Sequence, residues 1–598
     1  MLAMGRLSRR GRAVWIAALA GALLIVFSAS ALAASPSADD RRVEQGVRSE
    51  APDASKVEES YVRLHDPLPD SAAEHPRSCD SIGYLRFRNA GGPGKAKRAD
   101  AVVVNIPGFL GGAGSFDQLA RNTVRSAAAR GEDVEFWALD RRANCLEDHR
   151  GVNASARERD PKVAFDYYFG GRKVNGRAFD GFVSREDAAF LEDFGLDRTV
   201  RDWYSIVTRE LPGQERRERK LICGGHSLGG PLTAAFAGWD FDGDPDTRRD
   251  AGYKQCAGFV GLDTTFSITG GAGAPSGAGI LTGLIAQSGA APYIDAPPLT
   301  PRTIQIVPIT GAASYERPEA ESPINRLIPR TPEFDLTLRL LYSRDAASFA
   351  TGQPSIRDFR LTNQAVLGGI FDDNSAGISI LRSSVGFLAG GPLVDKDFPA
   401  PDGTLALPEQ PRGPLYRWQT YDRVGRNGKP VPPNDSGQPY TSRESEVTDI
   451  EQFARGSFEA PADFTEQYFP TRIFTDVAAA QAGDRSGDLS NLRYDGVSKR
   501  PGLLIQAGDS DDNSGEDSGP PEQGEPPNEM PDSREVILPG YNHLDVVTAA
   551  RKQNDGRPEG SSTSLVDFAC DVVLGCERGG SGGDRGRGFT RGSPPVRR

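Results

Sequence analysis

The stretch KLICGGHSLGGPLTAAFAGW, residues 220–239, contains the pattern that decides the fold. An apolar run ends at the pentapeptide GHSLG, Gly225–Gly229, and a run of small and apolar residues, 231–239, follows it. A G-x-S-x-G pentapeptide between a strand and a helix is typical of a nucleophile elbow, a sharp turn that projects the central serine from the top of a sheet. We therefore expect Ser227 to be a nucleophile.

The same five-letter pattern occurs a second time, as GGSGG at residues 579–583. Arginine and glycine surround that copy, and neither a strand-like nor a helix-like run flanks it. Because an elbow requires a strand before the serine and a helix after it, the flanking sequence favours Ser227 over Ser581.

Strand-like and helix-like runs alternate on both sides of the elbow. The strand-like runs are 83–89, 100–108, 133–142, 220–225, 256–263, 501–509 and 534–543, and the helix-like runs are 116–131, 185–211, 231–239 and 561–575. Strands that alternate with helices form βαβ units, and these units build a mainly parallel sheet flanked by helices. The predicted fold class is therefore α/β.

Between residues 264 and 495 this alternation breaks down, and we interpret the region as a cap inserted after the strand that ends near residue 263. Its segment 280–294 suits a lid over an acyl substrate and the core of the cap equally well. The predicted divisions are a signal peptide at 1–33, a disordered linker at 34–60, the first part of the core at 61–265, the cap at 266–495, the second part of the core at 496–577 and a disordered Arg/Gly tail at 578–598.

The first 33 residues predict export. A basic stretch ends at Arg12, an apolar run extends from Ala13 to Phe27, and the A-x-A sequence 31–33 follows. This order is typical of a secretory signal peptide, so we expect a secreted or extracytoplasmic protein with no stable membrane insertion once the signal is cleaved. The sequence SRR at 8–10 favours the twin-arginine route, and an N-terminal membrane anchor is the alternative.

Net charge limits the class of partner. The chain of 598 residues has a formal net charge of −12. An acidic protein repels the phosphate backbone, so we expect no nucleic-acid partner. The small-molecule acyl substrate that we expect follows from the serine chemistry below.

Six cysteines predict disulfides. An even number in an exported chain indicates up to three bridges, and Cys570–Cys576 is favoured because the two residues lie close together in sequence. Cys223 lies in a strand-like run and is interpreted as a small buried apolar side chain.

Metal-binding motifs are weak in this sequence. Neither C-x-x-C nor H-E-x-x-H occurs, which argues against a zinc site. The acidic stretch WDFDGDPDTRRD, residues 239–250, spaces its aspartates like the oxygen ligands of Ca²⁺, but its glycine lies too early for such a loop and no matching glutamate follows. We therefore expect a solvated loop there, no metal and no cofactor.

A serine nucleophile needs a histidine base, and the sequence offers few. Of five histidines, only His543 follows Ser227, and it lies just after a strand-like run in LPGYNHLDVV. In the elbow architecture the chain order is serine, acid, histidine, so His543 is the predicted base. His226 is interpreted as elbow packing, and His149 as a residue that can line the mouth of the site.

The acid that orients the base has several candidates. Asp511 lies in GDSD, directly after the strand-like run 501–507, and is the predicted third member of the triad. Asp263, at the end of the preceding strand, is the alternative acid. Asp509 and Asp512 stay open as well.

An attack on a carbonyl also requires N–H donors for the oxyanion. The residue after the nucleophile, Leu228, supplies one backbone N–H, and the loop after the strand 100–106 supplies the other. That loop reads IPGFLGG, where Gly108 permits a close turn and Phe109 offers its N–H.

Together these motifs resemble the α/β-hydrolase superfamily: NIPGFLGG (105–112) resembles its oxyanion loop, GHSLGG (225–230) its elbow, GDSD (508–511) its acid turn and GYNHLD (540–545) its histidine loop. The resemblance covers about 80–265 and 496–577 and is strongest to secreted bacterial serine ester hydrolases and aminopeptidases. It departs from many members at Ile106 and Pro107, where they carry a histidine. The resemblance implies an α/β-hydrolase fold, an inserted cap and an acyl-enzyme on Ser227.

Three functions follow as expectations. Cleavage of a carboxylic ester comes first, and cleavage of an amide or peptide by the same triad comes second. A non-catalytic envelope or binding protein on a hydrolase fold is the alternative from another class.

Overall fold

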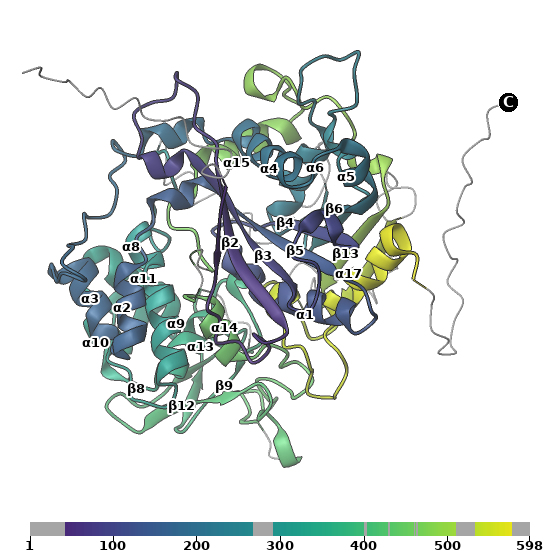
Figure 1. Ribbon diagram of the computed structural model, residues 1–598. Coiled ribbons are helices and arrows are strands. Elements are labelled where there is room, and N and C mark those ends of the chain that lie inside the picture. The colour runs from purple at the N-terminus through teal and green to yellow at the C-terminus, as the bar shows by residue number, and fades with distance from the viewer. Residues whose placement is uncertain are drawn as a thin grey trace, which may run out of the picture. The chain divides into compact units, whose positions relative to one another are not determined.

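The computed structural model (Figure 1) describes residues 42–266, 291–399, 403–428, 431–459, 461, 464–509 and 533–576. The predicted signal peptide, the Arg/Gly tail, most of the segment 280–294 and Asp511 lie outside the described residues. The contacts between residues place the described chain, which begins at Arg42, in one unit.

Nine strands form the central sheet. In spatial order they are β1 (Arg42–Gly46), β2 (Val57–His65), β3 (Ser81–Asn89), β5 (Val134–Asp140), β4 (Ala101–Ile106), β6 (Leu221–His226), β7 (Gly258–Leu262), β13 (Gly502–Ala507) and β14 (Ser533–Leu538). Each of the pairs β1–β2, β2–β3 and β3–β5 is antiparallel, and every later pair is parallel. This mainly parallel order is that of the α/β-hydrolase fold, so the predicted fold class is confirmed.

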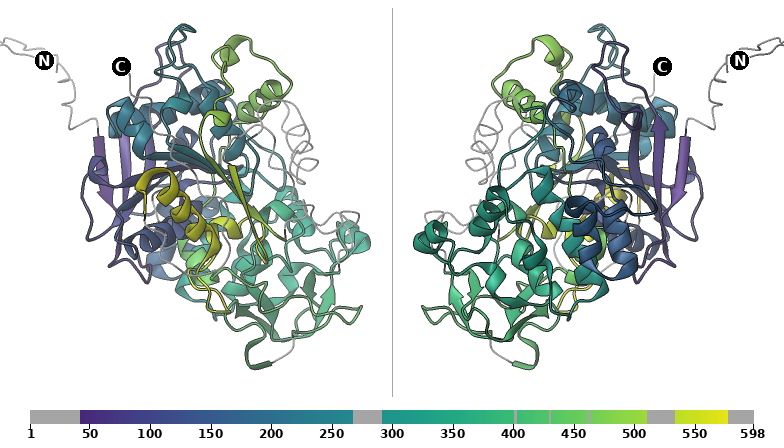
Figure 2. Two further views of the ribbon diagram at one scale, coloured as in Figure 1. Left: turned by 90° about the vertical axis from the view of Figure 1, so that its right-hand side faces the viewer. Right: turned by 90° about the vertical axis from the view of Figure 1, so that its left-hand side faces the viewer.

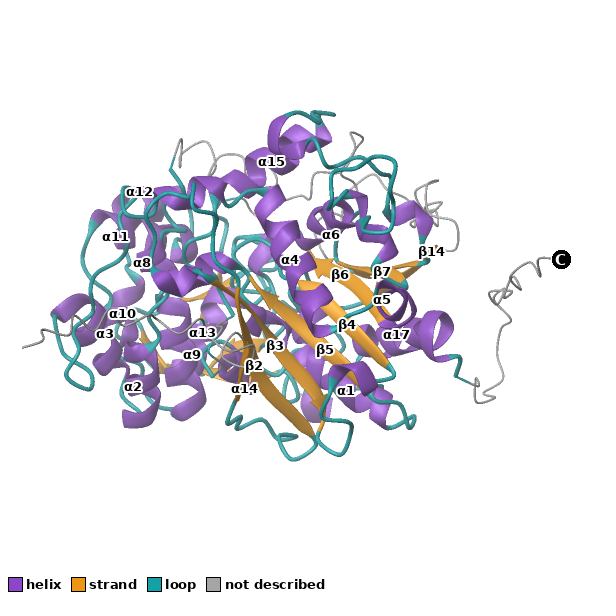
Figure 3. Ribbon diagram, turned by 45° about the horizontal axis from the view of Figure 1, so that its top comes forward, coloured by secondary structure: helices purple, strands orange, loops and turns teal. Residues whose placement is uncertain are grey.

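Helices cover both faces of the sheet because its central strands are apolar on both sides. On β4, Val102 and Val104 pack into one core, and Ala101 and Val103 pack into the other. The first core includes α4 (Leu196–Glu210), α6 (Gly229–Gly238) and α15 (Thr471–Gln481), and the second includes α1 (Asp117–Ala128), α16 (Asp545–Thr548) and α17 (Gly560–Ala569). Figure 3 shows α4 and α6 on one side of the strands and α1 and α17 on the other.

A third core lies beside the sheet and combines two parts of the chain. It contains α2 (Arg150–Glu158) and α3 (Pro161–Gly170), together with α9 (Ile306–Glu316), α13 (Asn363–Phe371) and α14 (Ile450–Gly456). The predicted cap region thus packs on two helices from before the elbow, and Figure 2 shows the teal and green members of this group below the sheet in both views. The other elements are α5 (Gln214–Lys220), α8 (Pro301–Ile304), α10 (Ile324–Leu327), α11 (Pro332–Tyr342), α12 (Ala346–Thr351), β8 (Arg360–Leu361), β9 (Gly386–Ala389), β10 (Leu393–Asp395), β11 (Ala406–Pro408) and β12 (Leu415–Thr420).

The segment 34–60 was predicted to be a disordered linker, and its described part is different. Residues 42–46 form β1 and residues 57–60 begin β2, so this part of the chain is ordered as the antiparallel edge of the sheet. In β2, residues 57–59 and 61–65 each alternate more and less buried positions, with a change of phase at the buried Ser60. This period of two is typical of a strand, and here it occurs among many charges.

Three disulfides join the six cysteines: Cys79–Cys145, Cys223–Cys256 and Cys570–Cys576. The favoured bridge between Cys570 and Cys576 is confirmed. The expectation of up to three bridges is confirmed as well. Cys223 is buried, as interpreted, and it is also bonded to Cys256. Disulfides persist in oxidising compartments, which agrees with an extracytoplasmic location. Across the described ranges, no helix combines the length and the apolar character needed to cross a bilayer.

Candidate active site

Ser227 occupies a strained turn between β6 and α6. Its φ is 56°, in the left-handed region that non-glycine residues rarely adopt. The turn is held by three hydrogen bonds: the Ser227 N–H donates to the Leu262 carbonyl at 3.0 Å, and the Ser227 carbonyl accepts from the Gly230 N–H at 2.9 Å and the Thr264 hydroxyl at 2.5 Å. The turn moves the chain out of the core at this point: His226 is buried, and the next residue, Ser227, is only half-buried.

Glycines make this turn possible because backbone occupies the space where side chains would be. A Cβ atom on Gly225 would lie 2.3 Å from the Gly229 carbonyl oxygen, and one on Gly229 would lie 2.4 Å from the Ile106 carbonyl oxygen. In the same way, a Cβ on Gly108 would lie 2.7 Å from the Cβ of Ser227. The loop that follows β4 therefore runs directly against the serine, as the predicted oxyanion role of Phe109 requires.

His543 lies in the loop after β14, and its ring is bound by a carboxylate from another strand. Its Nδ1 lies 2.5 Å from Oδ2 of Asp263, and both side chains are about nine-tenths buried. Asp263 directly follows β7, beside β6, with a φ of 43°, and its Oδ1 accepts the Ala507 N–H at 2.9 Å. Burial alone would raise the pKa of Asp263, but the hydrogen bond and charge of His543, with the Ala507 N–H, hold that pKa below its ordinary value.

The predicted acid, Asp511, lies outside the described residues, as does Asp512. Asp509 is described, and its hydrogen bonds go elsewhere. Its N–H donates to the Tyr541 carbonyl at 3.0 Å, and its Oδ1 accepts the Gly540 N–H at 3.2 Å. These bonds hold the first residues of the loop that carries His543. The structure thus brings the alternative acid, Asp263, together with His543.

His226 contacts the loop that carries His543. Its Nε2 lies 3.0 Å from the His543 carbonyl oxygen, and the two rings are 4.6 Å apart between centroids. A carbonyl only accepts, so Nε2 carries the proton and donates it. Burial first, and then the charge of His543, lower the pKa of His226 to about 3. This bracing role goes beyond the predicted elbow packing.

A buried carboxylate that the sequence did not reveal orders the same loop. Asp545 accepts hydrogen bonds from the Ser384 hydroxyl at 2.6 Å and the Asn542 N–H at 2.8 Å, and it also accepts the hydroxyls of Ser383 and Thr448. Ser383, Ser384 and Thr448 all come from the predicted cap region. The loop that carries His543 is therefore anchored by residues of the predicted cap region.

The oxyanion loop is clamped by a buried arginine. Arg141, one residue after β5, donates to the carbonyls of Pro107 and Gly108 at 2.6 Å each and to the Gly111 carbonyl at 2.7 Å. In a trans peptide the C=O and the following N–H point in opposite directions. Because the Gly108 carbonyl points at Arg141, the N–H of Phe109 points away from it.

Glu466, from the predicted cap region, holds both Arg141 and the oxyanion loop. Nε of Arg141 donates to Oε2 of Glu466 at 2.6 Å, and the N–H of Glu466 donates to the Leu110 carbonyl at 2.7 Å. Both side chains are buried. The sequence signal for Arg141 is its place directly after a strand, but Glu466 lies 325 positions further on and has none.

The remaining predicted residues are placed as follows. Leu228 is half-buried next to Ser227, and Phe109 is half-buried with its ring against Phe469 and Phe474. His149 directly precedes α2, and its Nε2 lies 3.8 Å from Oε2 of Glu147.

Comparison with known proteins gives fold neighbours only. No protein-family model matches the chain, and no curated protein does. Solved structures with a similar fold include a peroxisomal α/β-hydrolase of Saccharomyces cerevisiae (11% identity, 88% of this chain and 92% of that chain covered, TM-score 0.32), an epoxide hydrolase from an endophytic Streptomyces (14%, 83% and 93%, 0.29) and an esterase from Thermogutta terrifontis (10%, 84% and 97%, 0.29). At these identities and TM-scores the neighbours do not indicate an activity for this chain. Any assignment of activity therefore depends on the geometry of the site.

The buried His226 predicts a specific acid sensitivity. Its pKa falls from 6.5 to about 3 on folding, so the unfolded state binds more protons in this range and the free energy of unfolding falls as the pH falls from 6.5 toward 3. In His226→Gln the amide can still donate to the His543 carbonyl but takes up no proton. We expect the variant to lose less stability on acidification than the parent, by up to about 1.4 kcal/mol per pH unit. Urea unfolding between pH 7 and pH 4.5 measures this difference, and parallel pH profiles for the two proteins would contradict it.

Proposed function

We propose that this protein is an exported serine hydrolase that cleaves a carboxylic ester through an acyl-enzyme on Ser227. The observation that carries the proposal is the bond between His543 and the buried Asp263, at the strand ends beside a strained serine elbow. Nucleophile, base and acid follow distinct strands, β6, β14 and β7, whose carboxyl ends meet at one edge of the sheet (Figure 3).

In the proposed reaction, the hydroxyl oxygen of Ser227 attacks the acyl carbonyl while Nε2 of His543 takes its proton. Asp263 holds the imidazole in the tautomer that exposes Nε2 and stabilises the imidazolium that forms. The N–H groups of Phe109 and Leu228 bind the developing oxyanion. The imidazolium then protonates the leaving alcohol, and a water molecule activated by His543 releases the acid.

Asp263 is the proposed acid in place of Asp511. The Nδ1 of a histidine has one proton to donate, and the Oδ2 of Asp263 lies within hydrogen-bond distance of it. The second oxygen of Asp263 is fixed by the Ala507 N–H, so the carboxylate cannot rotate without losing a hydrogen bond. A carboxylate that stays ionised at neutral pH suits this role.

The sequence leaves two alternative functions open, and the experiment below tests both. The same triad can cleave an amide or a peptide bond, since the chemistry differs only in the leaving group. A non-catalytic envelope or binding protein would retain the fold without a reactive serine. A small acyl substrate, an extracytoplasmic location and export by the twin-arginine route are part of the same proposal.

Labelling with a fluorophosphonate probe tests the nucleophile directly, because the probe reacts with activated serines whatever the natural substrate is. We expect the native protein to be labelled, and we expect labelling to be lost in Ser227→Ala and in His543→Ala. Hydrolysis of short-chain and long-chain acyl esters and of aminoacyl amides would then rank the substrates. An unlabelled native protein would support the non-catalytic alternative, and labelling that persists in Ser227→Ala would exclude this nucleophile.

Comparison of two aspartate variants tests the acid. Asp263→Asn removes the acceptor for Nδ1–H and permits the wrong tautomer, so kcat should fall by roughly 10⁴-fold. Asp511→Asn should stay within about threefold of the parent, because Nδ1 is already bound. Steady-state kinetics on one ester substrate decides between them, and the reverse ranking would make Asp511 the acid.

Exchange of Arg141 tests the clamp on the oxyanion loop. Arg141→Lys keeps a positive charge beside Glu466 but cannot bind three carbonyls at once, so the N–H of Phe109 should lose its fixed direction. We expect the rate of probe labelling and kcat to fall by roughly 10²-fold or more, the cost of one oxyanion donor, with little change in KM.

The matched control is Arg142→Lys. Arg142 is equally buried, and it binds Asp202 and the carbonyls of Asp66 and Cys79 instead of the oxyanion loop. It should lose comparable thermal stability and retain its labelling rate. Equal loss of activity in both variants would mean that Arg141 acts only through stability.

A further inference from the structure

Three carboxylates from two distant segments meet in the interior. Asp372 and Asp373 directly follow α13, and Glu446 precedes α14; each offers an oxygen within 4.8 Å of the others. Asp372 and Glu446 are 0% exposed, and Asp373 is half-buried. Within the described part of the chain none of the three forms an ion pair, although the charge of Arg382 acts on Asp373.

Several oxygens in this cluster have no donor. The Oδ1 atoms of Asp372, Asp373 and Asn374 are buried and accept no hydrogen bond. The Oδ2 of Asp372 accepts the Asn374 N–H at 3.1 Å, so its fully buried side chain is held in place with Oδ1 unpartnered. The great majority of buried polar atoms in proteins do have partners. Three unpartnered oxygens on consecutive residues therefore indicate a ligand that oxygen atoms bind.

We propose that Asp372, Asp373 and Glu446 bind a calcium ion. The candidate ligands are all oxygens, which suits a hard cation and excludes the sulfur and nitrogen sites that zinc prefers. The amide Oδ1 of Asn374 is a fourth candidate in the same turn. Calcium accepts six to eight oxygens in irregular geometry, whereas magnesium retains several waters and suits a buried site poorly. This proposal goes beyond the hydrolase chemistry and does not rest on it.

The site would also connect the cap to the histidine loop. Oδ2 of Asp373 accepts the side-chain N–H of Asn542 at 3.0 Å, and Asn542 is next to His543. Glu446 accepts the Gly386 N–H at 2.6 Å and the Thr441 hydroxyl at 2.7 Å, which ties a second part of the cap to the same point. A bound ion would therefore hold three segments together beside the proposed active site.

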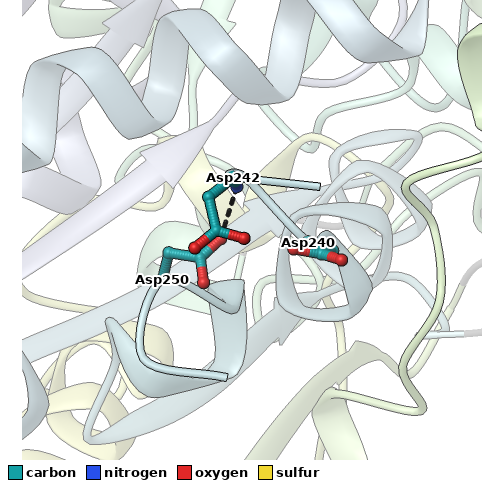
Figure 4. Close-up of side chains that lie close together, drawn as sticks. All are labelled: Asp240, Asp242 and Asp250. Atoms are coloured by element: carbon teal, nitrogen blue, oxygen red, sulfur yellow. Dashed lines mark hydrogen bonds between the residues drawn. The ribbon is translucent and has the colours of Figure 1, made fainter. Parts of the chain in front are cut away.

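A second acidic group offers a matched control. Asp240, Asp242 and Asp250 lie close together in the loop after α6 (Figure 4), and the Asp242 N–H donates to Oδ2 of Asp250 at 2.6 Å. Asp242 is exposed, and Asp240 is already paired with Arg493 at 2.8 Å. Solvent and a guanidinium thus balance the charges of this loop.

The experiment measures bound calcium and thermal stability on the full chain. The protein is first treated with a chelator, and the chelator is then removed. It is then titrated with CaCl₂, and bound calcium is measured by equilibrium dialysis with elemental analysis. We expect one ion per chain and a rise in Tm of about 5 °C or more at saturation. MgCl₂ at the same concentration should give a clearly smaller rise, and an equal rise would overturn the choice of calcium.

Two variants locate the ion. Asp372→Asn should lose the bound calcium and the calcium-dependent rise in Tm, and without calcium it should be at least as stable as the parent because one repelling charge is gone. Glu446→Gln provides the same test at a second position. Asp242→Asn should respond to calcium like the parent. No bound calcium in the parent, an unchanged response in both Asp372→Asn and Glu446→Gln, or loss of the response in Asp242→Asn would each overturn the proposal, and none of these readouts depends on whether the protein hydrolyses esters.

Discussion

The left-handed conformation of Ser227 is the constraint on which the rest of the site depends. A non-glycine residue in this region costs of order 1–3 kcal/mol and persists only where its surroundings enforce it. Here β6 lies in the middle of the sheet, α6 starts at once, and the carbonyls of Gly229 and Ile106 fill the space beside the turn. The elbow is thus fixed by backbone contacts that only glycine permits, and these contacts place the oxyanion loop and the serine side by side.

Buried charges hold the loops around the elbow. Arg141 donates to three carbonyls of the oxyanion loop and to Glu466, and Asp545 accepts from five donors around the histidine loop. Removal of one partner from the Arg141–Glu466 pair leaves an uncompensated buried charge, which typically costs about 3–5 kcal/mol. Glu466, Ser383 and Ser384 come from the predicted cap region, so this region is part of the framework of the site.

The sequence was informative where the signal is local. The strand before Ser227, the helix after it and the position of His543 follow from apolar runs and chain order, and the structure has those elements where they were predicted. The contact of Asp263 with His543 was not a local signal, because candidate acids follow more than one strand. That contact arises only through the tertiary fold, in which β7 packs against β13 and Asp263 accepts the Ala507 N–H. Arg141 and Glu466, or Asp373 and Asn542, meet only through the tertiary fold, and no sequence spacing reveals them. The first residues of β2 were predicted to lie in a disordered linker, because their charged side chains obscure the alternation of buried and exposed positions.

The bridge between Cys223 and Cys256 links the strand that ends at Ser227 to the segment that leads into the strand ending at Asp263. Both sulfur-bearing residues are 0% exposed. An oxidant can reach these thiols only while β6 and β7 are still uncovered, because the finished core seals them. A chain that crosses the membrane already folded and reduced would carry the pair as inaccessible thiols, whereas a chain that folds after crossing closes the bond first. The order of oxidation and core formation thus decides whether the strands that lead to Ser227 and to Asp263 are joined covalently.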